Sequence, residues 1–218
     1  MFRKVLEWPD SALKNKSIPF TREDPTSWIA DLRDSFNVTG GLGLAAPQIG
    51  IFRRAIVVNP SHLNISSDEM LLMINPSLEL SGEIYKSNEG CFSVPYTAGN
   101  VPRYSHCKVV FYNEDWEEQW LNLQGLAAAC VQHEVDHLDG ILYLDRMGRM
   151  SRQLLIKKIK KQKKKLADLE RAAQEEFDKD HAELLAGFGG KEKTKTTHSR
   201  KRKAKPRRKN KRQRSRKK

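Results

Sequence analysis

The sequence predicts an α+β fold in which antiparallel or mixed sheets pack around one central helix, followed by a long basic helix and a disordered tail. Short strand-like segments separated by Pro, Asn and Gly occupy most of residues 55–123. Long helices do not alternate with them, which argues against a doubly wound parallel sheet. A single apolar helix pattern follows at residues 123–138, and we expect the sheets to enclose it.

Two helices are predicted before the strands. Residues 10–17 form a short helix, and residues 25–38 form a longer one that begins at Pro25, a residue suited to a first turn. The apolar face of the longer helix comprises Trp28, Ile29, Leu32 and Phe36. The strand-like segments then lie at residues 55–58, 71–74, 83–85, 108–112 and 119–123.

Two more helices are predicted after the strands. The stripe of the helix over residues 123–138 consists of Leu126, Ala129, Cys130, His133 and His137. The helix over residues 151–186 is highly charged and ends at a run of glycines. Its thin apolar seam consists of Leu155, Ile159, Leu166, Leu169, Ala173 and Phe177.

Charge divides the chain into parts. The formal net charge of the 218 residues is +13, but residues 191–218 alone hold 17 Lys or Arg and one acid, and the first 190 residues carry a net charge of −3. We therefore predict a globular domain over residues 1–150, a charged helix over 151–190 and a disordered basic tail over 191–218. About 150 residues are enough to bury a core without disulfide bonds.

The number of cysteines and the composition of the N-terminal segment indicate the cellular compartment of the protein. Cys91, Cys107 and Cys130 are odd in number and widely spaced, which favours free thiols in a reducing compartment. The N-terminal segment contains acids and no apolar stretch before a cleavage site, and no run reaches about 18 apolar residues. We expect a cytoplasmic protein with no membrane segment.

Residues 133–137, His-Glu-Val-Asp-His, form an HExxH motif. On a helix, histidines at positions i and i+4 lie on one face and can share a metal ion, and Glu134 can reach a water on that metal. The alternative is a helix that contains two histidines by chance. The apolar setting and the intervening Glu favour the metal site, which normally requires a third protein ligand.

The third ligand decides the class of enzyme. An extended zinc-protease motif would have His at position 143, which is Tyr143, and a thermolysin-like pattern would need an acid where residues 155–165 have none. Cys91, within Glu-Gly-Cys-Phe-Ser, remains as a candidate, since a thiolate is a strong metal ligand. An isolated cysteine in this setting is more often a core thiol.

A third segment completes the pattern. Residues 41–48, Gly-Leu-Gly-Leu-Ala-Ala-Pro-Gln, allow close backbone approach to a ligand and supply the amide of Gln48. Together with EGCFS and HEVDH, this segment resembles the peptide deformylases, whose three motifs occur here in the family's order. The resemblance covers residues 1 to about 165 and implies that residues 1–150 are a deformylase catalytic domain.

The resemblance implies a ligand set and a reaction. Cys91, His133 and His137 would hold one divalent metal ion, usually Fe²⁺, which Zn, Ni or Co can replace. A metal-bound hydroxide would attack the formyl group of an N-terminal formylmethionine. Glu134 would act as the general base and pass the proton to the departing amine.

The resemblance also implies substrate contacts. The side chain of Gln48 and the backbone N–H of Phe92 would stabilise the oxyanion. The backbone at Gly43 and Leu44 would pair with the peptide as an added strand. Other substrate-binding residues would be Glu89, Leu126, Ala129 and Cys130. The last three form an apolar methionine pocket and can equally be core of the helix.

Two features flank these positions. Arg103 is expected to pair with Glu89 and to orient the loop around Cys91. Where many bacterial members have an Arg after EGCFS-type motifs, this chain has Tyr-Thr-Ala-Gly-Asn at residues 96–100. Substrate contacts from this loop are therefore open, whereas the metal and catalytic positions are intact.

The basic extension concerns partners. In bacterial relatives a C-terminal helix docks near the ribosomal exit tunnel, and the helix from residue 151 is placed to do the same. The tail has no aromatic residues, so we expect it to contact phosphates without reading bases. A solvated tail without a partner and a nuclear-import signal at residues 200–203 are the alternatives.

We thus expect a monomeric metallohydrolase whose partners are a formylated nascent peptide and the ribosome or its RNA. Two other hypotheses compete with it. One is a metal-dependent peptidase, which Tyr143 disfavours. The other is an RNA-binding factor on an inactive enzyme scaffold, which the intact catalytic positions disfavour.

Overall fold

The structure, a computed structural model, describes residues 1–24, 26–63 and 70–188. The predicted tail over residues 191–218 lies outside the described residues. The chain divides into two compact units, Met1–Asp168 and Leu169–Lys218. Helix α4 (Arg149–Phe188) runs through the boundary between them.

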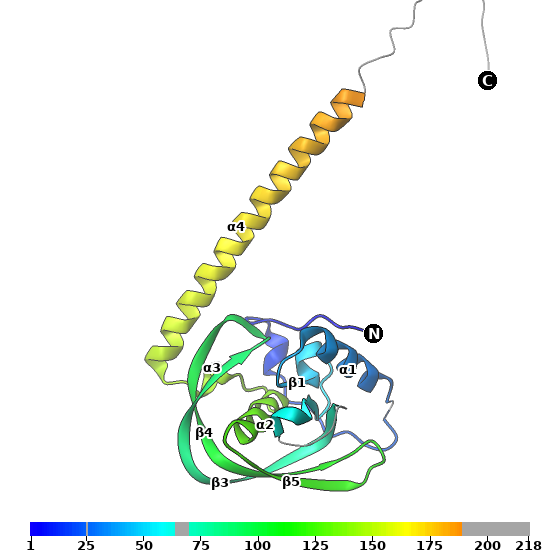
Figure 1. Cartoon of the computed structure of the whole chain (residues 1–218), viewed down its shortest axis with the longest axis vertical. Coiled ribbons are helices and arrows are strands. Elements are labelled where there is room, and N and C mark those ends of the chain that lie inside the picture. Colours follow the sequence, from blue (N-terminus) through cyan, green and yellow to red (C-terminus); the bar gives the residue numbers. More distant parts are fainter. Residues whose placement is uncertain (25, 64–69, 189–218) are drawn as a thin grey trace, which may run out of the picture. The chain divides into compact units, whose positions relative to one another are not determined.

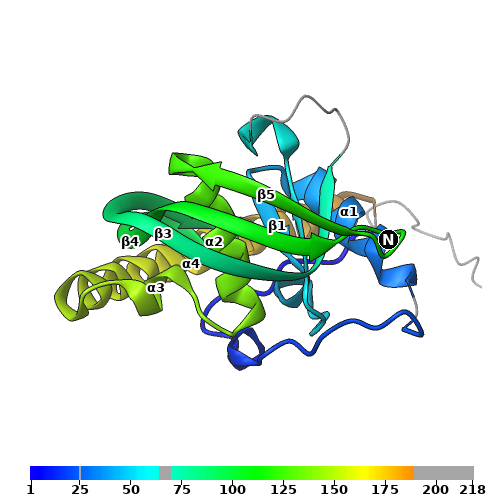
Figure 2. The ribbon, with the colours of Figure 1, turned by 90° about the horizontal axis from the view of Figure 1, so that it is seen from below.

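One five-stranded sheet dominates the first unit (Figures 1 and 2). Its strands neighbour one another in chain order, and all pairings between them are antiparallel. They are β1 (Gly43–Ala45), β2 (Ala55–Val58), β3 (Leu71–Cys91), β4 (Val94–Tyr112) and β5 (Glu118–Gln124). The α+β class with an antiparallel sheet is thereby confirmed.

Strands β3 and β4 are longer than predicted. The segments predicted at residues 71–74 and 83–85 belong to one strand of 21 residues, and β4 begins at Val94 rather than at residue 108. Pro76 and Gly82, which read as breaks in the sequence, lie at two register shifts of the β3–β4 ladder. Such bulges bend a ribbon without ending it, which is why the expectation of separate strands was wrong.

The helices match the predicted pattern more closely. Helix α1 (Ser27–Thr39) buries all four residues of its predicted apolar face. Helix α2 (Gly125–Leu138) carries the HEVDH segment, and every residue from Ala127 to Leu138 is buried. The shorter helices are η1 (Ser11–Lys14), η2 (Ala46–Ile49), η3 (Pro60–Leu63) and α3 (Tyr143–Arg146).

The core of the first unit consists of three apolar clusters. One joins α2 to the sheet, and a second joins α1 to β2. The third includes Tyr143 and Ile159, both fully buried, so the first turns of α4 are part of this unit. Figure 2 shows α2 lying against the curved ribbon of β3 and β4. The sheet therefore holds the HEVDH segment in a rigid, water-poor setting.

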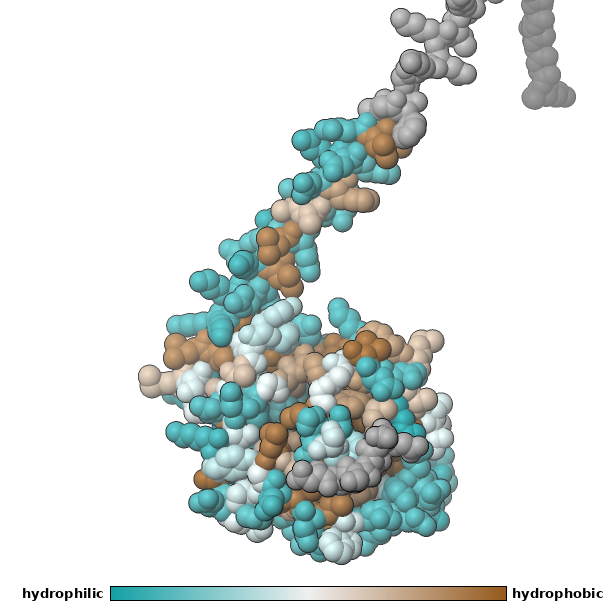
Figure 3. Space-filling view, viewed as in Figure 1, coloured by the Kyte–Doolittle hydropathy of each residue, from teal (hydrophilic) through white to brown (hydrophobic). Residues whose placement is uncertain are grey.

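The apolar seam predicted along α4 is covered only at its beginning. Leu155 and Ile159 pack in the third cluster, whereas Leu166, Leu169 and Phe177 are exposed. Figure 3 shows apolar side chains interleaved with hydrophilic ones along this helix. Within the described residues, no helix has both the length and the hydropathy to cross a membrane.

Candidate metal centre

Three side chains with ligand atoms meet at the end of β3. Cys91 ends this strand, and His133 and His137 lie one turn apart on α2 with ring centroids 5.0 Å apart. The Cys91 Sγ atom is 3.2 Å from His137 Nε2, and one ligand atom from each residue lies within 4.8 Å of the others. Metal–ligand bonds of about 2.0–2.3 Å bring tetrahedral ligands to such separations. The donor set and its size therefore fit one metal ion.

His133 is oriented by a carboxylate. Its Nδ1 atom lies 2.9 Å from Glu89 Oε2, an arrangement in which the ring donates a proton to the carboxylate. This contact leaves Nε2 of His133 available as a ligand atom. Metal-binding histidines commonly have such a partner, which fixes the tautomer and the ring direction.

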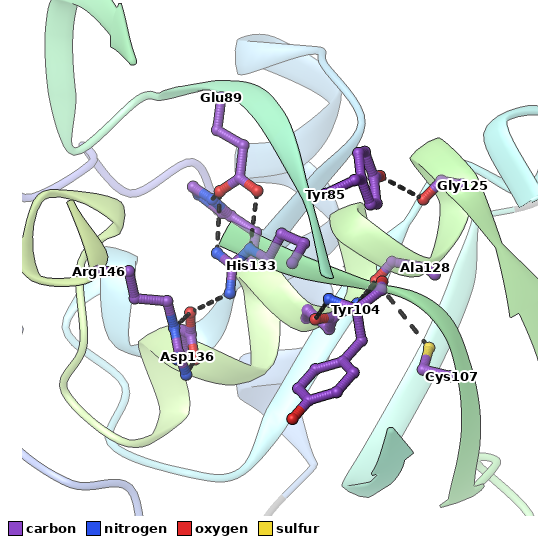
Figure 4. Close-up of polar contacts among 11 residues, drawn as sticks. Tyr85, Glu89, Tyr104, Cys107, Gly125, Ala128, His133, Asp136 and Arg146 are labelled. Carbon is purple, nitrogen blue, oxygen red and sulfur yellow. Dashed lines mark hydrogen bonds and ion pairs between the residues drawn. The ribbon is translucent and has the colours of Figure 1, made fainter. Parts of the chain in front are cut away.

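Behind this pair lies a network of charged side chains, of which Glu89, Arg103 and Asp136 are buried (Figure 4). Arg103 donates from Nε to Glu89 Oε1 at 2.7 Å and from Nη2 to Oε2 at 2.9 Å. Its Nη1 donates to Asp136 Oδ2 at 2.6 Å, and Arg146 Nε donates to the same oxygen at 2.5 Å. Burial tends to raise the pKa of Glu89, but the hydrogen bonds from Arg103 and His133 outweigh burial and lower it to about 2.

Glu134, unlike Glu89, has a carboxylate oxygen without a described hydrogen-bond partner. It is buried, and its Oε2 atom has no hydrogen-bond partner among the described residues. Burial raises its pKa to about 7. Because an unpartnered buried polar atom is costly, it marks a position where a ligand supplies the missing contact.

Gly43 on β1 is needed for this placement. A Cβ atom at this position would come within 2.8 Å of Glu134 Cγ and 2.9 Å of its Oε1. Real side chains do not approach so closely. The lack of a side chain at Gly43 therefore allows Glu134 to lie against the sheet edge.

Gln48 on η2 also faces the cluster. Its Nε2 atom is 3.5 Å from Cys91 Sγ and 3.2 Å from Ser93 Oγ, and its Oε1 accepts from the N–H of Ala45 at 2.8 Å. The accepted bond fixes the amide so that its donor points toward the thiol. The site thus contains a carboxylate and an amide donor beside the candidate ligands.

These groups open into a cavity of about 600 Å³. Five of the six candidate catalytic or ligand residues, all except His137, line it together with other predicted site residues: Gln48, Phe92, Glu134, Cys91, His133, Gly43, Glu89, Leu126, Ala129 and Cys130. Leu126 is 58% exposed, so it lines the cavity mouth rather than the core. Leu44 and Arg103 do not line the cavity, because the Leu44 side chain packs with the α1 cluster and Arg103 lies behind Glu89.

A family model described as polypeptide deformylase matches residues 2–153. The chain belongs to this family. A peptide deformylase of Teredinibacter turnerae is 37% identical over 166 residues, which cover 75% of this chain and 97% of the relative.

Solved deformylases share the fold. The crystal structure from Legionella pneumophila has a TM-score of 0.69 and 31% identity, over 77% of this chain and 98% of its own. A Met-Ala-Ser-bound class I type b deformylase from Acinetobacter baumannii has a TM-score of 0.60 and 32% identity, over 67% and 99% of the two chains. Deformylases are metalloenzymes, and the cluster of Cys91, His133 and His137 could hold the metal ion of this deformylase.

Sequence reasoning missed several residues of this deformylase. Ser87, Asn88 and Tyr96 also line the cavity, and Asp136 and Arg146 complete the charged network. Ser87 lies two residues before Glu89 on the same strand, so period-two alternation could have identified it. A carboxylate in an apolar helix likewise signals a cationic partner, but the sequence does not show that Arg103 and Arg146 provide it for Asp136.

Proposed function

We propose that this deformylase removes the N-formyl group from the N-terminal formylmethionine of nascent polypeptides. The observation that carries the proposal is the cluster of Cys91, His133 and His137 beside the unpartnered carboxylate oxygen of Glu134. The similar Acinetobacter protein was solved with Met-Ala-Ser, the peptide that deformylation of formyl-Met-Ala-Ser leaves. Family membership and site geometry therefore support the same reaction.

The cluster would hold one divalent ion, and we propose Fe²⁺, with Zn, Ni or Co as replacements. One thiolate and two imidazoles suit these metals better than Mg or Ca, which prefer oxygen ligands. When bound, the ion supplies Lewis-acid chemistry that polarises the formyl carbonyl and lowers the pKa of water. The Glu89 contact to His133 would keep that ligand oriented.

Glu134 would move the proton of the reaction. Its Oε2 atom would accept a proton from the attacking water and deliver it to the amine nitrogen as the C–N bond breaks. The absence of a side chain at Gly43 leaves room for this carboxylate at the cavity wall. The two products are formate and a peptide with a free N-terminus.

The developing oxyanion needs hydrogen-bond donors. The Nε2 atom of Gln48 and the backbone N–H of Phe92 would provide them, because both residues line the cavity, Gln48 Nε2 is 3.5 Å from Cys91 Sγ, and Phe92 follows Cys91 in the chain. Loss of one such donor typically costs about 3–4 kcal/mol of transition-state stabilisation. Ser93 and Ala45 hold the Gln48 amide in place for this role.

The substrate would bind along β1. This strand lies at one end of the sheet order and pairs only with β2 within the described sheet, so the backbone at Gly43 and Leu44 can accept a peptide as a further strand. Leu126, Ala129 and Cys130 would surround the methionine side chain. Backbone pairing explains how one site could serve nascent chains of many sequences.

Helix α4 supports a second part of the proposal, binding to the ribosome or its RNA. Of the lysines in residues 157–165, all except Lys163 are exposed. Exposed lysines can contact phosphates and release counterions, so binding should weaken with salt. Such a role places the monomeric enzyme in the cytoplasm beside the emerging substrate.

Anaerobic turnover of formyl-Met-Ala-Ser tests the reaction. The full chain is loaded with Fe²⁺ or Ni²⁺, and release of the free amine is measured. We expect metal-dependent release, and Glu134→Ala should lower it by about 100-fold to 10,000-fold while keeping the metal. No release despite bound metal would contradict the reaction, and cleavage of an internal peptide bond would favour a peptidase.

Ribosome pelleting tests whether the basic tail over residues 191–218 contributes to ribosome binding. The full chain and a version that ends at Gly190 are compared at low and high salt. We expect the full chain to co-sediment more strongly at low salt. Equal co-sedimentation of the two at low salt would exclude a role of the tail.

A further inference from the structure

Tyr96 has an unusual backbone conformation. Its φ angle is +70°, in the left-handed region that residues with a Cβ atom rarely adopt. Such strain persists only where the surrounding structure enforces it, and it gathers at functional sites. The surroundings of Tyr96 therefore need an explanation.

Among the described residues, two other non-glycine residues have a positive φ, and their contacts explain it. Asn75, at φ +50°, exchanges two hydrogen bonds with the backbone of Phe20, each 2.8 Å long. Trp116, at φ +62°, stacks on Phe20 at 5.6 Å between ring centroids. The Tyr96 side chain makes no hydrogen bond or ring contact with the described residues, and it belongs to none of the three apolar clusters.

The sheet register shows what enforces the conformation. Gly90 pairs with Ala98 and Cys91 pairs with Val94, so residues 95–97 are extra residues on β4 without a partner on β3. Tyr96 is the middle residue of this bulge. Bulges beside active sites commonly re-aim a side chain, and this one begins opposite the candidate ligand Cys91.

The bulge is fixed at Thr97, and the chain is also fixed at Ser93, two residues before the bulge begins. The Ser93 carbonyl accepts from the N–H of Trp8 at 2.7 Å, and the Thr97 hydroxyl lies 3.0 Å from the hydroxyl of buried Tyr143. The left-handed turn at Tyr96 is therefore part of a braced segment. The bracing determines where the ring is held.

That position is at the cavity. Tyr96 lines the 600 Å³ cavity, and 52% of the residue is exposed. The far wall near the ligands is buried and contains Ala129 and His133, so the half-exposed Tyr96 lies at the mouth. A peptide whose methionine occupies the apolar pocket must pass this mouth with its following residues.

We propose that Tyr96 is a substrate-positioning residue, whose ring packs on the peptide segment that follows the methionine. The inference rests on the proposed deformylase reaction and adds a residue that binds its substrate. An aromatic face offers a large apolar contact with a polar edge, which suits a peptide backbone of any sequence. The strained backbone at Tyr96 would thus be the conformation that keeps its ring at the cavity.

The test compares Tyr96→Gly, Tyr96→Phe and wild type on formyl-Met-Ala-Ser and on formyl-Met methylamide. Glycine removes the ring and relieves the positive φ, so we expect KM for the tripeptide to rise about fivefold to tenfold. The KM for the short substrate should change less than twofold. The melting temperature of Tyr96→Gly should rise by about 1–3 °C.

Tyr96→Phe retains the ring and should keep KM within twofold of wild type. Tyr104→Ala is the matched control, because Tyr104 is a partly exposed tyrosine of the same strand that does not line the cavity. It should leave KM unchanged. An unchanged tripeptide KM in Tyr96→Gly overturns the proposal, whatever the melting temperature.

Failure of the reaction itself is distinguishable. If wild type releases no amine, the proposed function fails, and calorimetric affinity for Met-Ala-Ser then decides the role of Tyr96. A fivefold or larger loss of affinity in Tyr96→Gly supports the positioning role. Equal affinity in wild type and Tyr96→Gly overturns it.

Discussion

Glu89 and Glu134 both line the cavity, but Arg103 and His133 occupy both carboxylate oxygens of Glu89, whereas Glu134 has an oxygen without a described partner. Both carboxylates are buried. Yet the pKa of Glu89 is lowered to about 2 by its hydrogen bonds against the effect of burial, and burial raises that of Glu134 to about 7.

Glu89 and Glu134 would therefore have different roles: Glu89 would position its neighbours, and Glu134 would take part in the reaction. A carboxylate that is fully hydrogen-bonded holds its neighbours still and stays ionised. A carboxylate that lacks a partner can exchange a proton with a ligand. We call the charged network of Glu89, Arg103 and Asp136 the packed side, and the surroundings of Glu134 with Gly43 and Cys91 the cavity side. Substitution on the packed side should therefore lower stability. Substitution on the cavity side should lower turnover.

The largest effect is expected at the cavity side, in Cys91→Ala. Removal of one of three candidate ligands should leave less than one-tenth of the metal and lower turnover by on the order of 1000-fold. Elemental analysis and amine release measure both. Cys107→Ala is the control, since Cys107 is buried in the core outside the cavity and should retain the metal. Full metal content in Cys91→Ala would remove Cys91 from the ligand set.

The packed side should respond to Arg103→Leu. This change leaves buried Glu89 without its cation and leaves Asp136 paired only with Arg146, and breaking such a buried network typically costs about 3–5 kcal/mol of unfolding free energy. Urea denaturation of the metal-loaded chain measures the loss. Arg152→Leu, which breaks a partly exposed pair with Asp145, should cost less than about 1 kcal/mol. Equal losses in the two variants would contradict the distinction between the sides.

Gly43→Ala tests the cavity side without removing a polar group. The new Cβ would displace Glu134, so we expect kcat to fall about 10-fold to 100-fold with little change in unfolding free energy. Gly148→Ala is the control, because a Cβ there meets nothing within 4 Å. A loss of stability equal to that of Arg103→Leu would place Gly43 on the structural side.

The sequence was informative where chemistry depends on local spacing. The i, i+4 histidines of HEVDH needed only a helix to share a face, and the helix forms as expected. The contact of Arg103 with Asp136 joins β4 to α2 across 33 residues, and no local pattern encodes such a distance. Arg146 adds a third element to the same carboxylate.

Tertiary structure also overrode two local signals. Pro76 and Gly82 interrupt the strand pattern, but the β3–β4 ribbon absorbs them as bulges, and pairing resumes after each register shift. The bulge that carries Tyr96 could not be anticipated either, since it depends on how Gly90 and Cys91 pair with β4. Residues at such irregularities are the ones for which a structure was required.

The smallest effect concerns how far helix α4 packs against the rest of the first unit. Lys163 donates to Glu7 Oε2 at 2.8 Å and to the carbonyl of Trp8 at 2.7 Å, one turn after the buried Ile159. Lys163→Ala should therefore lower the melting temperature by about 1–3 °C without changing turnover. Lys161→Ala, at an exposed lysine of the same helix, should leave it unchanged. If the two variants have the same melting temperature, the contacts of Lys163 do not stabilise the fold, and the packed part of α4 ends near Ile159.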